Sequence, residues 1–416
     1  MFTFIFLLFL LSGLGLRFWL AKRQIRHVLK HRDAVPSEFA ERISLRSHQR
    51  AADYTIARVQ LGNHERFADA IVLIALTLLG GIQALDLFFA AHIQHEILRQ
   101  LLLVLSVFAI MGLVGLPFNI WKRFKLDAKF GFNRMTPALF IRDTLLSAVI
   151  GAVLASVIIA VALWVMASSP SGWPFYVWLC WIAFNLFILW MYPSVIAPLF
   201  NQFSPLDRPS LQERIETLAT RCGFELNGLF VMDGSKRSSH ANAYFTGLGK
   251  NKRIVFFDTL LKQLNDDEIE AVLAHELGHF KHRHIVKRMV LSFGSALGLL
   301  LILSWLSTKI WFYTDLGVVP QFVRPNDGLS LVLFFVCLPV FTFWLKPLAS
   351  WFSRKDEFQA DSYAAQQCPP SALRSALLKL YNDNAATLTP DPLHSAFYDS
   401  HPPALQRLQH LKTHEA

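Results

Sequence analysis

Residues 268–280, EIEAVLAHELGHF, contain the motif that decides the architecture of this chain. Apolar residues recur through it at helical spacing and form one stripe: Ile269, Val272, Leu273, Leu277 and Phe280. His275, Glu276 and His279 are left to another side of the same helix. Histidines four residues apart in a helix have Cβ atoms about 5–6 Å apart, so both imidazoles can hold one metal ion. The HExxH spacing therefore predicts a metal site with Glu276 as the base beside it, as in zinc peptidases.

Signals before this helix place it in a small α+β unit. Asn265 and Glu268 form a capping box in its Asx version, which predicts the start of the motif helix. Upstream, we expect a helix over about 209–221 and short strands over 228–233, 241–246 and 252–257. A few strands followed by an HExxH helix are typical of a zincin-like protease core.

Long apolar blocks lie on both sides of this unit in the sequence. The chain of 416 residues is 53% hydrophobic and 17% charged, with a mean hydropathy of +0.37, which lies outside the range of soluble proteins. Several blocks are close to the ~20 residues that a helix needs to cross a bilayer. We expect seven spans: about 2–20, 68–90, 98–118, 143–168, 173–199, 286–312 and 328–350. No basic residue precedes the first block and no small-x-small site follows it, so we expect a retained anchor rather than a cleaved signal peptide.

Basic residues orient these spans. The loop 21–67 carries ten Lys and Arg and the loop 119–142 carries six, whereas 91–97 and 169–172 carry none and 313–327 carries one. This alternation follows the positive-inside rule and places the N-terminus outside, with 200–285 and 351–416 in the cytoplasm. The net charge of +10 has its source in this bias, so we expect no nucleic-acid partner.

The predicted fold class is mainly α, a seven-transmembrane-helix protein with a cytoplasmic α+β metalloprotease domain built from two sequence blocks. The predicted parts are transmembrane helices 1–5 in 1–199, the first protease block in 200–285, transmembrane helices 6–7 in 286–350, and the second protease block in 351–416.

A catalytic zinc site needs three protein ligands, and HExxH supplies two. His282 and His284 are the local candidates, but residue 285 is Ile, so the HExxHxxGxxH pattern fails. A helix that continued through 285 would have to break to bring a third histidine back, and no glycine is available there. Glu357 and Asp361 are better candidates, because their i, i+4 spacing puts one carboxylate on the metal and the other on a ligating imidazole.

At these residues the chain resembles the type I CAAX prenyl endopeptidases, which are integral-membrane zinc proteases with HELGH and EFQAD motifs. The resemblance extends over nearly the whole chain and includes the following segments: 235–247 (SKRSSHANAYFTG), 253–260 (RIVFFDTL), 129–133 (KFGFN), 192–200 (YPSVIAPLF) and 400–403 (SHPP) with Arg407. It implies seven membrane helices around a water-filled chamber that the protease domain caps.

The resemblance also implies a role for each matching residue. One Zn²⁺ per chain would be bound by His275, His279 and Glu357, with Glu276 as the general base and Asp361 holding a ligating histidine. The positions that would pair with the substrate backbone are Asn242, Ala243 and Tyr244. His401 and Arg407 match positions that help to polarise the substrate carbonyl and stabilise the oxyanion.

The predicted activity is that of a membrane-embedded zinc metalloendopeptidase, with the lipid bilayer and a peptide or protein substrate, prenylated or membrane-associated, as its partners. The sequence ends at 412–416 without an ER-retrieval signal, which favours a bacterial inner membrane. Two alternatives stay open. One is a heat-shock-type membrane quality-control metalloprotease with no prenyl requirement, and the other is a transporter or channel with a structural metal.

Overall fold

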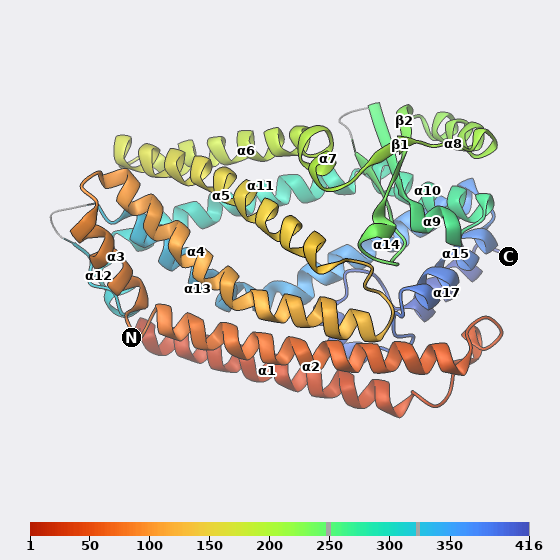
Figure 1. Cartoon of the computed structure of the whole chain (residues 1–416), viewed down its shortest axis with the longest axis horizontal. Helices are drawn as coiled ribbons and strands as arrows, with labels where there is room; N and C mark the ends of the chain where they lie inside the picture. Colours follow the sequence, from red (N-terminus) through yellow and green to blue (C-terminus); the bar gives the residue numbers. More distant parts are fainter. Residues whose placement is uncertain (247–250, 322–324, 416) are drawn as a thin grey trace.

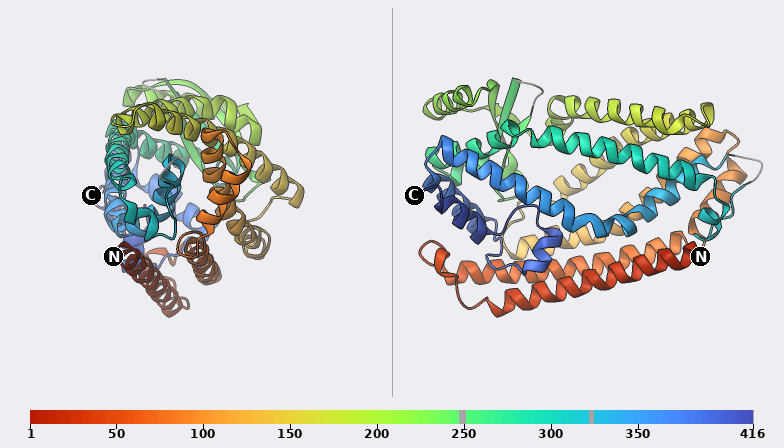
Figure 2. Two further views of the ribbon diagram at one scale, coloured as in Figure 1. Left: turned by 90° about the vertical axis from the view of Figure 1, so that its left-hand side faces the viewer. Right: turned by 180° about the vertical axis from the view of Figure 1, so that it is seen from behind.

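The structure, a computed structural model, describes residues 1–246, 251–321 and 325–415. Long helices run along the long axis of the molecule, and a sheet with shorter helices lies at one end (Figure 1). Viewed along that axis, the long helices are arranged in a ring (Figure 2). The N-terminus lies at the end of the molecule that is distant from the sheet, and the C-terminus lies at the sheet end (Figure 1).

Six helical stretches in the described parts of the chain are long and apolar enough to cross a membrane. They are α1 (Phe2–Lys30), α4 with η2 (Glu96–Trp121, Lys122–Asp127), α5 (Pro137–Ser168), α6 with η3 and α7 (Trp173–Met191, Tyr192–Ile196, Ala197–Phe200), α11 (His284–Ser307) and α13 with η5 and α14 (Asp327–Thr342, Phe343–Leu345, Lys346–Gln367). A seventh span results if the pair α2 (Leu45–Leu76) and α3 (Gly81–His92) is counted as one. The predicted mainly helical, multi-span fold is confirmed.

The second predicted span, 68–90, is broken rather than straight. α2 and α3 meet at an angle of 51° across a break of four residues, 77–80. Gly80 at the break has φ 80°, a left-handed conformation that costs glycine little and most other residues more. Hydropathy alone cannot detect such a bend, because apolar residues continue on both sides of it.

Four strands form the sheet, in the order β1-β2-β4-β3. β1 (Phe203–Pro205) pairs antiparallel with β2 (Glu225–Met232), β2 pairs parallel with β4 (Asn251–Phe257), and β3 (Ala243–Thr246) pairs antiparallel with β4. The three predicted strands correspond to β2, β3 and β4, whereas β1 was not predicted. Three residues carry too little alternation to be read as a strand. β3 is left at one edge of the sheet.

Short helices pack around this sheet in a second apolar core, separate from the core between the membrane helices. They are α8 (Pro209–Cys222), α9 (Asp258–Gln263), α10 (Asp266–Lys281), α15 (Pro370–Asp383) and α17 (Ala404–Lys412). α16 (Pro392–Tyr398) packs against α14 and α1 instead. α14 joins the two regions. It leaves the membrane helices at Lys346 and continues as one helix to Gln367, past the predicted boundary between residues 350 and 351.

Candidate metal centre and active site

α10 carries the HExxH motif, and its first turn is fixed by hydrogen bonds. The Asn265 side chain accepts from the Glu268 backbone N–H at 2.9 Å, and Glu268 accepts from the Asn265 backbone N–H at 2.9 Å, which confirms the predicted capping box. Glu268 also accepts from Lys379 Nζ and Ser375 Oγ of α15, both at 2.7 Å. In the predicted apolar stripe Ile269, Leu273 and Leu277 are buried, and Val272 and Phe280 are partly buried.

α10 crosses α14 in close contact at the motif. A Cβ placed on Gly278 would lie 3.0 Å from Ala360 Cα and 3.1 Å from the Ala360 carbonyl oxygen. The absence of a side chain at Gly278 therefore allows the two helices to approach. Glu357 lies one helical turn before Ala360 and reaches the motif histidines.

The three predicted ligands lie together, with one donor atom from each of His275, His279 and Glu357 within 4.8 Å of the others. The His275 Nε2 lies 3.5 Å from Glu357 Oε2, and the His279 Nε2 lies 3.4 Å from Glu357 Oε1. Ligands at ~2.0–2.1 Å from a tetrahedral zinc ion are ~3.3–3.4 Å apart, so these separations fit three ligands around one ion.

The Glu357 carboxylate is buried and only partly satisfied by its neighbours. Its Oε2 is buried, and no described residue donates a well-formed hydrogen bond to it. His401 Nδ1 lies 2.7 Å from this oxygen, but the His401 side chain is 65% exposed. A buried carboxylate oxygen is stabilised by positive charge beside it, and the Arg407 guanidinium lies 3.8 Å from this oxygen, beyond hydrogen-bonding distance. The donor set and this unsatisfied oxygen both fit a divalent metal.

Asp361 and Arg407 lie beside Nδ1 of His275, the ring nitrogen that does not face Glu357. The Asp361 Oδ1 lies 2.8 Å from His275 Nδ1, and the fully buried Asp361 accepts two hydrogen bonds from Arg407, at 2.5 and 2.8 Å. Burial alone would lower the pKa of His275, but its interactions with the carboxylates of Asp361 and Glu357 outweigh it and raise this pKa to about 9. Arg407 is itself 6% exposed and lies 3.8 Å from Glu357.

The remaining predicted residues lie on α10 and at β3. Glu276 follows His275 on α10 and is partly exposed. Asn242 is exposed and directly precedes β3, where Ala243 and Tyr244 pair with Phe256 and Val255 of β4. Their other backbone edge faces no strand among the described residues, so an extended peptide could pair there.

The break after α10 was not predicted. Because no glycine is available there, we expected the helix not to break and bring a third histidine back towards the motif. Instead, α10 ends at Lys281 and α11 begins at His284. Arg283 makes the break with φ 57°, which is uncommon for a residue other than glycine. His282 is exposed, whereas His284 is 1% exposed and lies 3.0 Å from His279. The only sequence feature that relates these two histidines is their spacing of five residues. Residues at this spacing do not share a face of an α-helix, so helical periodicity could not predict their contact.

Comparisons with known proteins agree with this geometry. A family model described as the CAAX prenyl protease N-terminal region with five membrane helices matches residues 24–202, and the model of peptidase family M48 matches residues 205–415. A CAAX prenyl protease 1 homolog of Dictyostelium discoideum is 34% identical over 407 residues, which cover 95% of this chain and 93% of that protein. The CAAX prenyl protease 1 of Saccharomyces cerevisiae is 36% identical over 77% of this chain and 73% of its own length.

A solved structure resembles the whole fold. The crystal structure of Ste24p from S. mikatae superposes with a TM-score of 0.92 and 29% sequence identity, and the match covers 99% of each chain.

Proposed function

Since the chain belongs to peptidase family M48 and is a membrane metalloendopeptidase of the CAAX prenyl protease type, we propose that His275, His279 and Glu357 bind one zinc ion per chain and that Glu276 is its general base. The observation that carries this proposal is the separation of 3.4–3.5 Å between the two Nε2 atoms and the carboxylate oxygens of Glu357. Direct hydrogen bonds would normally be shorter.

A zinc ion at this position would lower the pKa of a bound water towards ~7 and polarise the scissile carbonyl. Glu276 removes the proton from the attacking water and later delivers it to the leaving amine. His401 is exposed beside Glu357, and its imidazole donates a hydrogen bond to the oxygen on which negative charge develops. Arg407 is buried behind Asp361, so its contribution to the oxyanion is electrostatic, and it also fixes the carboxylate that orients His275.

The peptide substrate pairs with the edge of the sheet. Asn242, Ala243 and Tyr244 present backbone groups along an edge strand, and a peptide added there is held extended by main-chain hydrogen bonds. We propose a substrate with a prenylated CAAX-type C-terminus, because the relatives with the same ligand motifs are named CAAX prenyl proteases.

The alternation of basic and unbasic loops supports a topology with the N-terminus outside and the catalytic part in the cytoplasm. A bacterial inner membrane stays a prediction of the sequence.

Among the alternatives, membership in a peptidase family removes the transporter or channel with a structural metal. The quality-control protease is distinguished from the CAAX protease by its substrates. We expect the purified chain to cut a farnesylated CAAX peptide faster than the same peptide without the farnesyl group and faster than unrelated membrane-protein fragments, with E276Q as the blank. Equal cutting of all three would replace the CAAX assignment with general quality control.

A further inference from the structure

We propose that His284 is a positioning residue that fixes the tautomer of the ligand His279. The inference rests on the proposed zinc site. His279 directs its Nε2 towards Glu357 and its other ring nitrogen, Nδ1, towards His284 Nδ1 at 3.0 Å. Two ring nitrogens can share a hydrogen bond only if one carries a proton and the other does not.

The neighbours of His284 Nε2 determine which of the two ring nitrogens of His284 carries the proton. Its Nε2 lies 2.9 Å from the side-chain oxygen of Gln359 and 3.5 Å from a carboxylate oxygen of Asp356. Both neighbours are acceptors, so Nε2 of His284 bears the hydrogen. The neutral ring then has its lone pair on Nδ1 and accepts from Nδ1–H of His279. That leaves the lone pair of His279 on Nε2, which is the atom that faces the metal site.

The break at Arg283 makes this contact possible. On an uninterrupted α-helix, a residue five positions after His279 would lie about 140° around the axis from it. The left-handed conformation of Arg283 instead starts α11 in a new direction and buries His284 against His279. A non-glycine residue in this conformation is strained, and strain of this kind is often found at functional sites. The two ligand histidines are thus held differently, His275 by a carboxylate and His279 by a neutral imidazole.

Metal affinity tests the proposal independently of activity. The zinc affinity of the full-length protein in detergent is measured with a competing chelator for wild type, H284A, H284N and H282A. H284N keeps an acceptor near the position of Nδ1, and His282 is an exposed neighbour whose ring lies 5.5 Å from that of His284. We expect H284A to bind zinc about 10–100-fold more weakly, H284N to recover most of the loss, and H282A to match wild type.

The possible failures are distinguishable. Absence of zinc binding in wild type would refute the proposed function itself. Wild-type affinity in H284A would refute only the role of His284. A loss in H284A that H284N does not restore, accompanied by an equal loss of thermal stability without metal, would assign His284 to packing instead.

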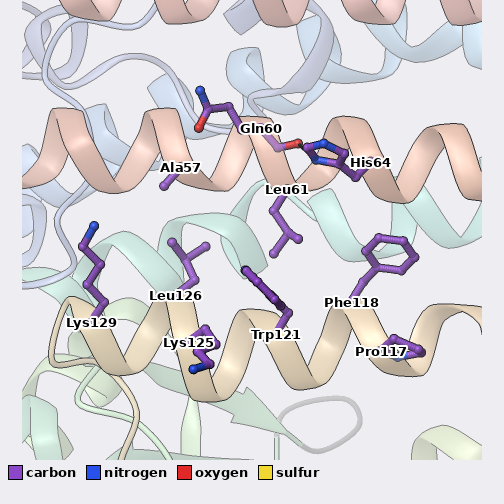
Figure 3. A pocket seen from close by; sticks show the side chains of 10 residues that line it. All are labelled: Ala57, Gln60, Leu61, His64, Pro117, Phe118, Trp121, Lys125, Leu126 and Lys129. Carbon is purple, nitrogen blue, oxygen red and sulfur yellow. Dashed lines mark hydrogen bonds between the residues drawn. The ribbon is translucent and has the colours of Figure 1, made fainter.

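A groove of about 820 Å³ lies between α2 and α4, away from the metal ligands (Figure 3). Its apolar lining includes Leu61, Phe118 and Trp121, and Lys125 and Lys129 lie towards one end of it. Both lysines are exposed, and neither forms an ion pair with a carboxylate in the described parts of the chain. Lys125 lies in the last turn of the apolar stretch Glu96–Asp127, where a helix that crosses the bilayer would approach the lipid headgroups.

The geometry points to an anionic glycerophospholipid in this groove, with its phosphate at the two lysines and an acyl chain along Leu61 and Phe118. Basic pockets between membrane helices at a membrane face recognise acidic headgroups in this way. The charge of the two lysines and the apolar walls match the two ends of such a lipid.

Native mass spectrometry of the purified chain tests this with added phosphatidylglycerol and phosphatidylcholine. We expect wild type to retain phosphatidylglycerol preferentially, the double variant K125Q/K129Q to bind it about 30-fold more weakly, and K122Q, an exposed lysine of the same helix outside the groove, to behave as wild type. Equal retention of both lipids by wild type, or an equal loss in K122Q, would overturn the assignment.

Discussion

Gly278 of α10 and Ala360 of α14 form the contact that sets how closely the two ligand-bearing helices approach. A Cβ on Gly278 would meet backbone atoms of Ala360 at 3.0–3.1 Å, which a neighbouring backbone cannot easily avoid. The relative position of the metal ligands therefore depends on Gly278, which is not itself a ligand.

The first prediction concerns this contact. G278A should destabilise the protein by about 1–3 kcal/mol, as overpacking does, and should weaken metal binding because α14 moves away with Glu357. Thermal unfolding and bound-metal content are the measurements. G294A on α11 is the matched control, since a Cβ there has no neighbour within 4 Å. Full metal content in G278A would show that the helices adjust without cost.

The second prediction separates the base from the ligands. Because Glu276 is not among the three clustered donors, E276Q should retain the metal while peptide hydrolysis falls at least about 10²–10⁴-fold. Metal content and turnover are measured on the same sample. A wild-type rate in a metal-loaded E276Q sample would refute the mechanism.

The third prediction concerns pH and metal removal. After chelation, His275 holds a proton up to its raised pKa of about 9, and zinc must displace that proton. Apparent zinc affinity should therefore rise about tenfold per pH unit from pH 7 to 9 for this one proton and level off above it. D361N removes one of the two carboxylates that raise this pKa, so its affinity should level off at a lower pH. The same plateau in both proteins would contradict the assignment of the proton to His275.

The fourth prediction concerns stability in acid. Burial would raise the pKa of Glu268, but hydrogen bonds from Lys379, the Asn265 backbone and Ser375 outweigh it and hold the pKa below its ordinary value. The unfolded chain therefore takes up this proton at a higher pH than the folded protein does. The carboxylate contributes stability at neutral pH that is lost as the pH falls through the folded pKa.

The comparison for this fourth case is E268Q. At pH 7 we expect E268Q to be less stable than wild type by about 1 kcal/mol, since Lys379 is 40% exposed and solvent screens the pair. The difference should disappear in acid. Thermal melts from pH 3 to 7 give the measurement, and a difference that stays constant with pH would assign the effect to hydrogen-bond geometry alone.

Some of these features could be predicted from the sequence and others could not. The HExxH and ExxxD pairs are local, because residues at i and i+4 share a helical face in any protein, and the apolar blocks report membrane spans by length alone. The break at Arg283 depends on tertiary contacts of His284, which no periodicity records. The same holds for the bend at Gly80 and for β1, whose three residues are stabilised by pairing with β2.

α10 and α14 supply the metal ligands, yet α11 and α13 lie between them in the chain. During synthesis, the segment with His275 and His279 leaves the ribosome before Glu357 has been made. A nascent chain at that stage has two of the three donors and lacks Asp361, His401 and Arg407. The order of the sequence thus leaves the site without its third donor until α11 and α13 have been synthesised.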